Sequence, residues 1–216
     1  MKFGRLVLCS GAAALGFVLT TAGIASASNQ WSCWHWEKST IGTQTAAGGY
    51  WGTIIGSEFS QWESGTCVNF SGGSEIVGDA GFYGATGWLG IARILDYDAG
   101  ACAILKADAL MNQSYLDGGS YSETADRHVA CQEIGHTIGL DHRKGPKNQT
   151  CMNDQTLGFP NFDAHDADTV AAITVGCNGG GNGGCDNGGE RGRRKCNDGF
   201  DNDGDGCIDG ADPDCQ

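Results

Sequence analysis

One twelve-residue string constrains this chain more than any other feature: residues 131–142 read Cys-Gln-Glu-Ile-Gly-His-Thr-Ile-Gly-Leu-Asp-His. Gln132 and His136 are one helical turn apart and share a face, with Glu133 beside them. Gly139 allows the chain to reverse after the helix, so that His142 can return toward His136. Neutral imidazoles suit Zn²⁺, and a carboxylate beside metal-bound water suits hydrolysis. The string therefore predicts a helix, a reversal and a metal-dependent hydrolytic site.

The beginning of the chain indicates the compartment. Basic residues precede a mostly small or apolar stretch from Leu6 to Ile24, and Ala25-Ser26-Ala27 forms a small-residue cleavage site. This is the pattern of a secretory signal peptide over residues 1–27. A membrane helix is the alternative, but Ser, Thr and Gly dilute the apolar stretch and a cleavage site follows it. We expect a secreted, extracellular protein without stable membrane insertion.

Charge and cysteine content narrow the class of protein further. The chain has 216 residues, with 13 Lys and Arg against 26 Asp and Glu. Removing residues 1–27 leaves 11 bases against 26 acids, a net charge of −15. A chain this acidic lacks the basic footprint of a nucleic-acid binder. The same cleavage lowers the cysteine count from 11 to 10, an even number that suits disulfides in an oxidising compartment.

Composition divides the mature chain into a body and a tail. Residues 28–177 carry enough apolar side chains for one packed domain. Residues 178–195 form a Gly-rich linker that cannot bury enough surface to fold by itself. Residues 196–216 form a short acidic tail.

Periodicity and turn signals predict the elements of the body. We expect strands over residues 50–55, 65–70, 87–95 and 102–110, of which 87–95 is expected to be buried. We expect a short helix near residues 57–63. Ser120, with Glu123 three residues later, has the capping-box pattern that begins a longer helix. Gly139 is placed to end that helix in a left-handed C-cap. A last helix is expected over 164–175, with Asp163 as its N-cap.

The central string resembles the metzincin zinc-protease signature, Glu-x-x-His-x-x-Gly-x-x-His, with the first His replaced by Gln132. Downstream, Thr150-Cys151-Met152-Asn153 resembles the Met-turn of that family. Residues 87–94, Gly-Trp-Leu-Gly-Ile-Ala-Arg-Ile, resemble the strand that lines the cleft and pairs with substrate. The stretches Val-Ala-Cys-Gln-Glu-x-Gly-His-Thr and Thr-Cys-Met are similar to those of matrixin-like secreted bacterial proteins that also carry Gln at this position. The resemblance covers about residues 31–175.

This resemblance implies an α+β fold, in which a twisted mixed sheet is accompanied by an active-site helix, a Met-turn and a C-terminal helix. It implies Zn²⁺ held by His136, His142 and a third donor. Three alternatives stay open for that donor: Gln132 binds through its side-chain oxygen, His165 supplies a nitrogen, or the site holds metal poorly. Glu133 would act as general base toward a metal-activated water and then protonate the leaving amine.

The resemblance also assigns supporting roles. Met152 would lie beneath the metal without binding it. A bridge between Cys131 and Cys151 would tie the active-site helix to the Met-turn and fix the metal geometry. Thiolate ligation is the alternative, and secretion favours the disulfide.

The tail has the spacing of a calcium loop. Its candidate ligands, at loop positions 1, 3, 5, 7, 9 and 12, are Asp201, Asp203, Asp205, Cys207 (through its carbonyl), Asp209 and Asp212. Gly206 falls at position 6, where the turn requires glycine, whereas Asp212 replaces the usual Glu. The segment resembles a single thrombospondin-type-3-like repeat, which implies a small loop-rich tail that binds Ca²⁺. A solvated acidic tail is the alternative.

Together these features predict a secreted zinc-dependent endopeptidase that acts on a protein or peptide substrate and carries a calcium-binding appendage. The alternative is a non-catalytic, secreted, calcium-dependent binding or adhesion protein with a degenerate protease body. The intact Glu133 favours the enzyme, because loss of function alone would not be expected to spare the general base.

Overall fold

The computed structural model describes residues 29–145, 147–155 and 157–177. Its centre is a mostly parallel, five-stranded sheet with the strand order β2-β1-β3-β5-β4. The strands are β1 (Thr40–Thr45), β2 (Asn69–Gly72), β3 (Ile76–Gly81), β4 (Gly90–Asp98) and β5 (Ala103–Asn112). β4 runs antiparallel to β5, and the other neighbouring strands are parallel. β2 and β4 are therefore the edges of this sheet.

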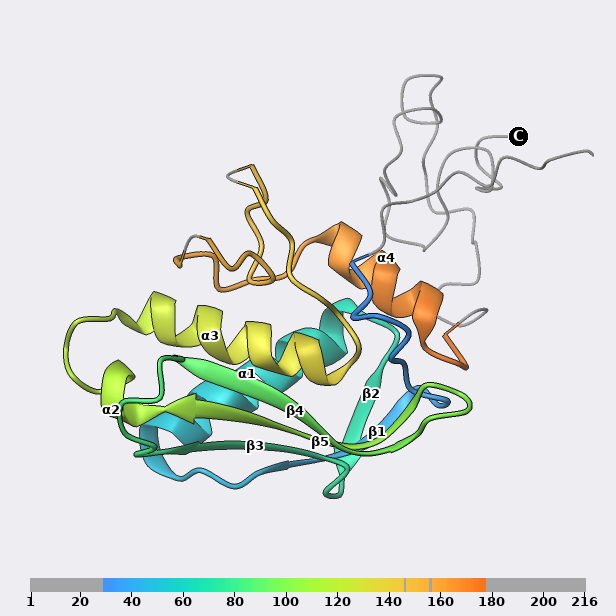
Figure 1. The fold of residues 1–216 in the computed structure, drawn as a ribbon, viewed down its shortest axis with the longest axis horizontal. Coiled ribbons are helices and arrows are strands. Elements are labelled where there is room, and N and C mark those ends of the chain that lie inside the picture. Colours follow the sequence, from blue (N-terminus) through green and yellow to red (C-terminus); the bar gives the residue numbers. More distant parts are fainter. Residues whose placement is uncertain (1–28, 146, 156, 178–216) are drawn as a thin grey trace, which may run out of the picture.

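Helices α1 (Gly49–Gly65) and α3 (Glu123–Thr137) lie on the same side of the sheet (Figure 1). The core between these layers contains large side chains of α1, including Trp51, Ile55 and Trp62. The short helix α2 (Gln113–Leu116) follows β5, and α4 (Ala164–Ile173) lies away from the sheet, near the end of α3 (Figure 1). The mixed sheet with helices on it agrees with the expected α+β class.

Several expected elements differ from the observed ones. Residues 50–55, expected as a strand, belong to α1, because Trp51, Ile55 and Trp62 recur at helical spacing and are buried together. The strand expected over 65–70 is also wrong in its bounds, since β2 begins at Asn69 after α1 ends. Neither β1 nor β3 was expected from the pattern; both are short strands whose position depends on pairing with distant segments.

Two further expectations are corrected near the site. α3 begins after Ser122, whose side chain accepts a hydrogen bond from the Ala125 backbone N–H, and not after Ser120. The stretch 87–95 was expected to be buried, but β4 begins at Gly90 and its residues are half-buried or exposed. β4 pairs with β5 and no other described strand, so its outer backbone edge stays accessible.

The expectations at the ends of the helices are mostly confirmed. α4 begins after Asp163, whose side chain caps the helix in a reciprocal capping box with Asp166. Gly139 has a φ of +98°, in the left-handed region, just after α3 ends. β5 covers the strand expected over 102–110.

Three disulfides connect the described segments: Cys33–Cys102, Cys67–Cys177 and Cys131–Cys151. The last is the pair that the sequence suggested. Disulfides of this kind are typical of oxidising compartments. Among the described residues no helix is both long and apolar enough to cross a membrane.

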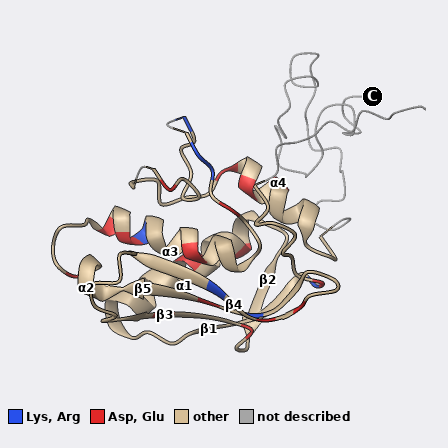
Figure 2. Ribbon diagram, viewed as in Figure 1, with Lys and Arg blue, Asp and Glu red and all other residues tan. Residues whose placement is uncertain are grey.

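The predicted signal peptide (1–27), the predicted linker (178–195) and the candidate calcium ligands between residues 201 and 212 lie outside the described residues. Within the described part, acidic positions outnumber basic ones along the ribbon (Figure 2). The acidic character expected from the composition therefore extends to the body of the protein.

Candidate active site

A cleft of about 610 Å³ lies beside α3, and the central string lines it. Its lining comes from α3, from residues 87–92 leading into β4, and from the segments that follow α3 and Met152. Gln132, Glu133, His136 and His142 all contribute to this cleft. The structure therefore brings the predicted catalytic and metal-binding side chains of the string to one place.

Two glycines allow the surrounding elements to approach α3. A Cβ added at Gly90 would lie 2.6 Å from both Glu133 Cγ and Val129 Cγ1, so β4 packs against the helix through a bare backbone. A Cβ at Gly135 would lie 2.5 Å from Met152 Sδ and 2.9 Å from Trp62 Cζ2. Glycine is required at these positions for close packing. The role of Gly90 was missed, because its neighbours on α3 are distant in sequence.

The two histidines of the string face each other through their Nε2 atoms, which are 2.9 Å apart. His136 Nδ1 lies 2.7 Å from the Leu140 carbonyl oxygen, and a carbonyl can only accept, so Nδ1 carries the proton. Burial lowers the pKa of His136 to about 4. His136 is thus a neutral imidazole that presents its Nε2 lone pair to His142, the form that binds metal.

The other ring nitrogen of His142 faces a carboxylate. His142 Nδ1 lies 3.6 Å from Asp154 Oδ2, an ion-pair distance that is too long for a hydrogen bond. When Nδ1 of His142 carries the ring proton, the lone pair on its Nε2 points at the lone pair on His136 Nε2. Two such lone pairs at 2.9 Å repel each other unless a proton or a metal cation lies between them.

The third group is the side-chain amide of Gln132, whose nitrogen has no hydrogen-bond partner. Gln132 is 9% exposed, and its Nε2 is buried. Turning the amide by 180° would leave the oxygen at that buried position instead. Buried side-chain amides are ordinarily hydrogen-bonded, so the unpaired nitrogen of Gln132 is an exception in this cleft.

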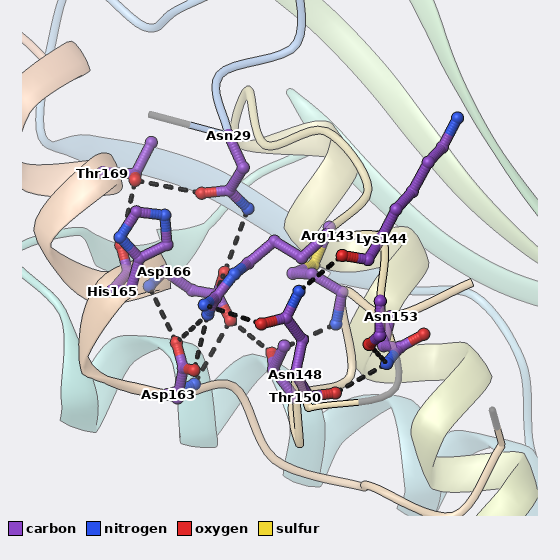
Figure 3. A network of polar contacts seen from close by, with 12 residues as sticks. Asn29, Arg143, Lys144, Asn148, Thr150, Asn153, Asp163, His165, Asp166 and Thr169 are labelled. Carbon is purple, nitrogen blue, oxygen red and sulfur yellow. Dashed lines mark hydrogen bonds and ion pairs between the residues drawn. The ribbon is translucent and has the colours of Figure 1, made fainter. Parts of the chain in front are cut away.

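His165, the alternative third donor, lies elsewhere. It lines a separate hollow of about 460 Å³, which it shares with His142 but not with His136 or Gln132. Figure 3 shows His165 on α4, beside Thr169 and Asn29. Among the described residues, no three His, Cys, Asp or Glu side chains gather as a metal-binding group. A metal at His136 and His142 would therefore take its third protein donor from another residue type, and Gln132 is in place.

Glu133 is nearly buried in the cleft, with 6% of its surface exposed. Burial raises the pKa of its carboxyl to about 8, and a hydrogen bond with the Ala92 backbone opposes this shift. A carboxyl with a raised pKa can hold and release a proton near neutral pH, as general acid–base chemistry requires. Its position on α3, next to Gln132, is the one that the sequence predicted.

Met152 is fully buried and packs against α3 at Gly135. The preceding Cys151 is bonded to Cys131 on α3, with 5.9 Å between the two Cα atoms. The Met152 carbonyl accepts a hydrogen bond of 2.7 Å from the Arg143 backbone N–H, directly after His142. The turn at Met152 thus braces both α3 and the segment that carries His142.

The His142 segment is also fastened to α4. The Arg143 guanidinium pairs with Asp163, and Asp166 receives hydrogen bonds from Thr150 Oγ1 and Asn29 Nδ2 (Figure 3). Asp166 is fully buried, and burial raises the pKa of its carboxyl. The polar network therefore connects the Met152 turn, α4 and the start of the described chain.

Residues 29–31 also contribute to the site, although no sequence pattern predicts this. Asn29 Nδ2 donates to the Asp141 carbonyl at 3.1 Å, and Trp31 N–H donates to the Gly139 carbonyl at 2.7 Å. The Trp31 ring makes an edge contact with His136, with 5.7 Å between centroids. The segment thus supports the loop between the two histidines, although about a hundred residues separate them in the chain.

Comparison with models of known protein families and with curated proteins finds no match for this chain.

Proposed function

We propose that this protein is a secreted, zinc-dependent endopeptidase of the metzincin type. The observation that carries the proposal is the pair of Nε2 atoms, 2.9 Å apart, of which His136 Nε2 presents a lone pair because its Nδ1 donates to the Leu140 carbonyl. Two imidazoles on a tetrahedral Zn²⁺, each at 2.0–2.1 Å, would have nitrogens about 3.3 Å apart. The observed pair needs only a small separation to accept the ion.

The donor set supports this choice of ion. Neutral imidazole nitrogens with the opposite nitrogen hydrogen-bonded are the common ligands of zinc. We propose Gln132 as the third protein donor, through its amide oxygen, because its side chain lines the same cleft and its amide nitrogen is buried without a hydrogen-bond partner. An amide oxygen is a weaker donor than imidazole, so we expect the affinity for Zn²⁺ to be lower than that of a site with three histidines.

Bound zinc would supply a Lewis acid that activates water and polarises the scissile carbonyl. Glu133 would accept the proton from the attacking water and deliver it to the leaving amine. Its burial suits both steps, because the raised pKa keeps the carboxyl able to exchange a proton near neutral pH. The Ala92 backbone and the close approach of Gly90 would hold the carboxyl in place.

The accessible edge of β4 supports a peptide as substrate. Residues 87–92 line the cleft, and β4 pairs with β5 alone among the described strands. An extended peptide could therefore add to this edge by backbone hydrogen bonds and pass over Glu133. We also propose that the tail, residues 196–216, binds Ca²⁺ through the carboxylates named above.

The test is metal analysis combined with a comparison of Glu133→Ala and wild-type protein. We expect about one zinc per chain at the body and cleavage of an unfolded protein substrate that the Glu133→Ala variant loses by a factor of at least about 100. Glu37→Gln is the matched control, because Glu37 is exposed and outside the cleft lining. Purified protein that holds no zinc, with proteolysis absent or equal in the variant, would refute the proposal and favour a non-catalytic binding protein.

A further inference from the structure

His128 is a fully buried histidine that the zinc-protease signature does not include. It lies on α3, one turn before Gln132. Its Nε2 is 3.1 Å from the Asn153 carbonyl oxygen, and its Nδ1 is 3.3 Å from the Phe159 backbone nitrogen. A carbonyl can only accept and a backbone N–H can only donate, so these partners determine the tautomer. Nε2 carries the proton and Nδ1 accepts.

These two bonds reach both ends of the segment that follows Met152. Three residues of that segment, Asn153, Asp154 and Leu157, line the cleft, and we call them the cleft wall. His128 thus connects α3 to the first residue of the cleft wall and to Phe159 just beyond it. Because α3 also carries Gln132, Glu133 and His136, the same helix positions the proposed catalytic group and this wall.

The start of the cleft wall has a second set of restraints. Asn153 is fully buried, and its side-chain amide donates to the Gly145 carbonyl at 3.0 Å and to the Asn148 carbonyl at 2.6 Å (Figure 3). These bonds hold Asn153 to the loop after His142, whereas His128 holds it to α3. For Phe159, the His128 ring supplies the side-chain acceptor of the backbone N–H.

We propose that His128 is a positioning residue that fixes the cleft wall and thereby determines which substrate side chain the cleft accepts. Leu157, which is 41% exposed, and Val129 offer apolar surface to the cleft, and Asp154 lies at the end near His142. Because Leu157 and Val129 are apolar, we expect the substrate side chain that contacts them to be apolar. The part that concerns selectivity rests on the proposed peptidase function, and the part that concerns the wall does not.

Two substitutions separate the two hydrogen bonds of the ring. In His128→Gln, the amide can donate to the Asn153 carbonyl from near the Nε2 position but leaves Phe159 N–H without its acceptor. In His128→Asn, the side-chain oxygen can accept from Phe159 N–H near the Nδ1 position but does not reach Asn153. His35→Asn is the matched control, because His35 lies outside the cleft lining and bonds to its neighbour Cys33.

The first measurement is amide hydrogen exchange at Phe159 by NMR, which needs no activity. We expect exchange about five- to tenfold faster in His128→Gln, and within about twofold of wild type in His128→Asn and in the control, from the usual strength of one hydrogen bond. The second is kcat/KM for peptides that differ in the size of one apolar side chain. We expect the discrimination to fall about tenfold in His128→Gln, mainly through KM, and to be largely restored in His128→Asn, with zinc content unchanged in both.

Each failure has its own signature. Unchanged exchange at Phe159 in His128→Gln would overturn the positioning role whether or not the protein is a peptidase. Faster exchange with unchanged discrimination would overturn the selectivity role alone, while a wild-type protein that cleaves no peptide would overturn selectivity together with the proposed function. If the variants do not fold, the ¹⁵N shifts of the His128 ring in wild type are decisive. A proton on Nδ1 in place of Nε2 would overturn the assignment.

Discussion

Alanine in place of Gly90 would put a methyl group into the contact between β4 and α3. The added Cβ would lie 2.6 Å from Glu133 Cγ and Val129 Cγ1 and 2.7 Å from Glu133 Oε1. Carbon atoms in contact are ordinarily 3.5–4.0 Å apart, so either the strand or the side chains must move by about 1 Å. Overpacking of this kind costs about 1–3 kcal/mol of folding stability.

Activity should suffer more than stability, because Glu133 is one of the groups displaced. A misplacement of about 1 Å in a catalytic group can lower the rate about 100-fold. The assay is thermal unfolding of Gly90→Ala together with kcat/KM on a peptide substrate. Glu133→Ala gives the residual activity that remains without the carboxyl. Gly72→Ala is the matched control, since Gly72 also lies in a strand but a Cβ there meets no atom within 4 Å.

The expected result is a loss of about 1–3 kcal/mol in unfolding free energy and about 100-fold in kcat/KM for Gly90→Ala, against small changes for Gly72→Ala. A Gly90→Ala variant that unfolds and cleaves like wild type would refute the packing argument. A variant that loses stability but retains full activity would show that the Glu133 carboxyl is not positioned by this contact.

Three further predictions concern groups around the site. Gln132→His should tighten zinc binding by an order of magnitude or more in a chelator competition, because imidazole is the better donor, and unchanged affinity would exclude Gln132 as a ligand. Burial raises the pKa of Glu58, which pairs with Arg127, to about 7 from 4.5, so its ionisation should lower stability as pH rises between these values. This contribution is about 3 kcal/mol, and urea unfolding of Glu58→Gln against wild type at pH 4.5 and 7.5 should reveal it as a difference in slope. Removing the Cys131–Cys151 bridge with a double Ala substitution should lower the free energy of unfolding by about 3 kcal/mol, given the 20-residue separation, and should weaken zinc retention. A double variant with the Tm and zinc content of wild type would contradict the bracing role.

The candidate site was largely predictable because its signal is local. Gln132, Glu133 and His136 lie within five residues of a helix, and their common location follows from helical spacing alone. The left-handed Gly139 and the Asp163 cap are likewise decided by neighbouring residues, and the structure has both. Calcium ligation by the tail stays a prediction.

The sheet was less predictable because its strands depend on distant partners. β1 and β3 pair with segments some 30 residues away. The local pattern of residues 50–55 predicts a strand, but their apolar residues lie on one helical face with those further along α1. β4 is exposed because it lies at the edge of the sheet. The local sequence pattern does not indicate which strand will be an edge.

The sequence by itself therefore determined which chemical groups are available: an imidazole, a carboxylate and an amide at helical spacing, and a second imidazole shortly after the helix, in a chain whose cysteines suit an oxidising compartment. Only the tertiary structure decided that His165 lies in a separate hollow, that Gly90 admits β4 to the helix, and that His128 holds the cleft wall. The physical reason is the range of the interactions. Caps and helical spacing act within a few residues, whereas close packing and buried hydrogen bonds join segments whose proximity exists only after the chain has folded.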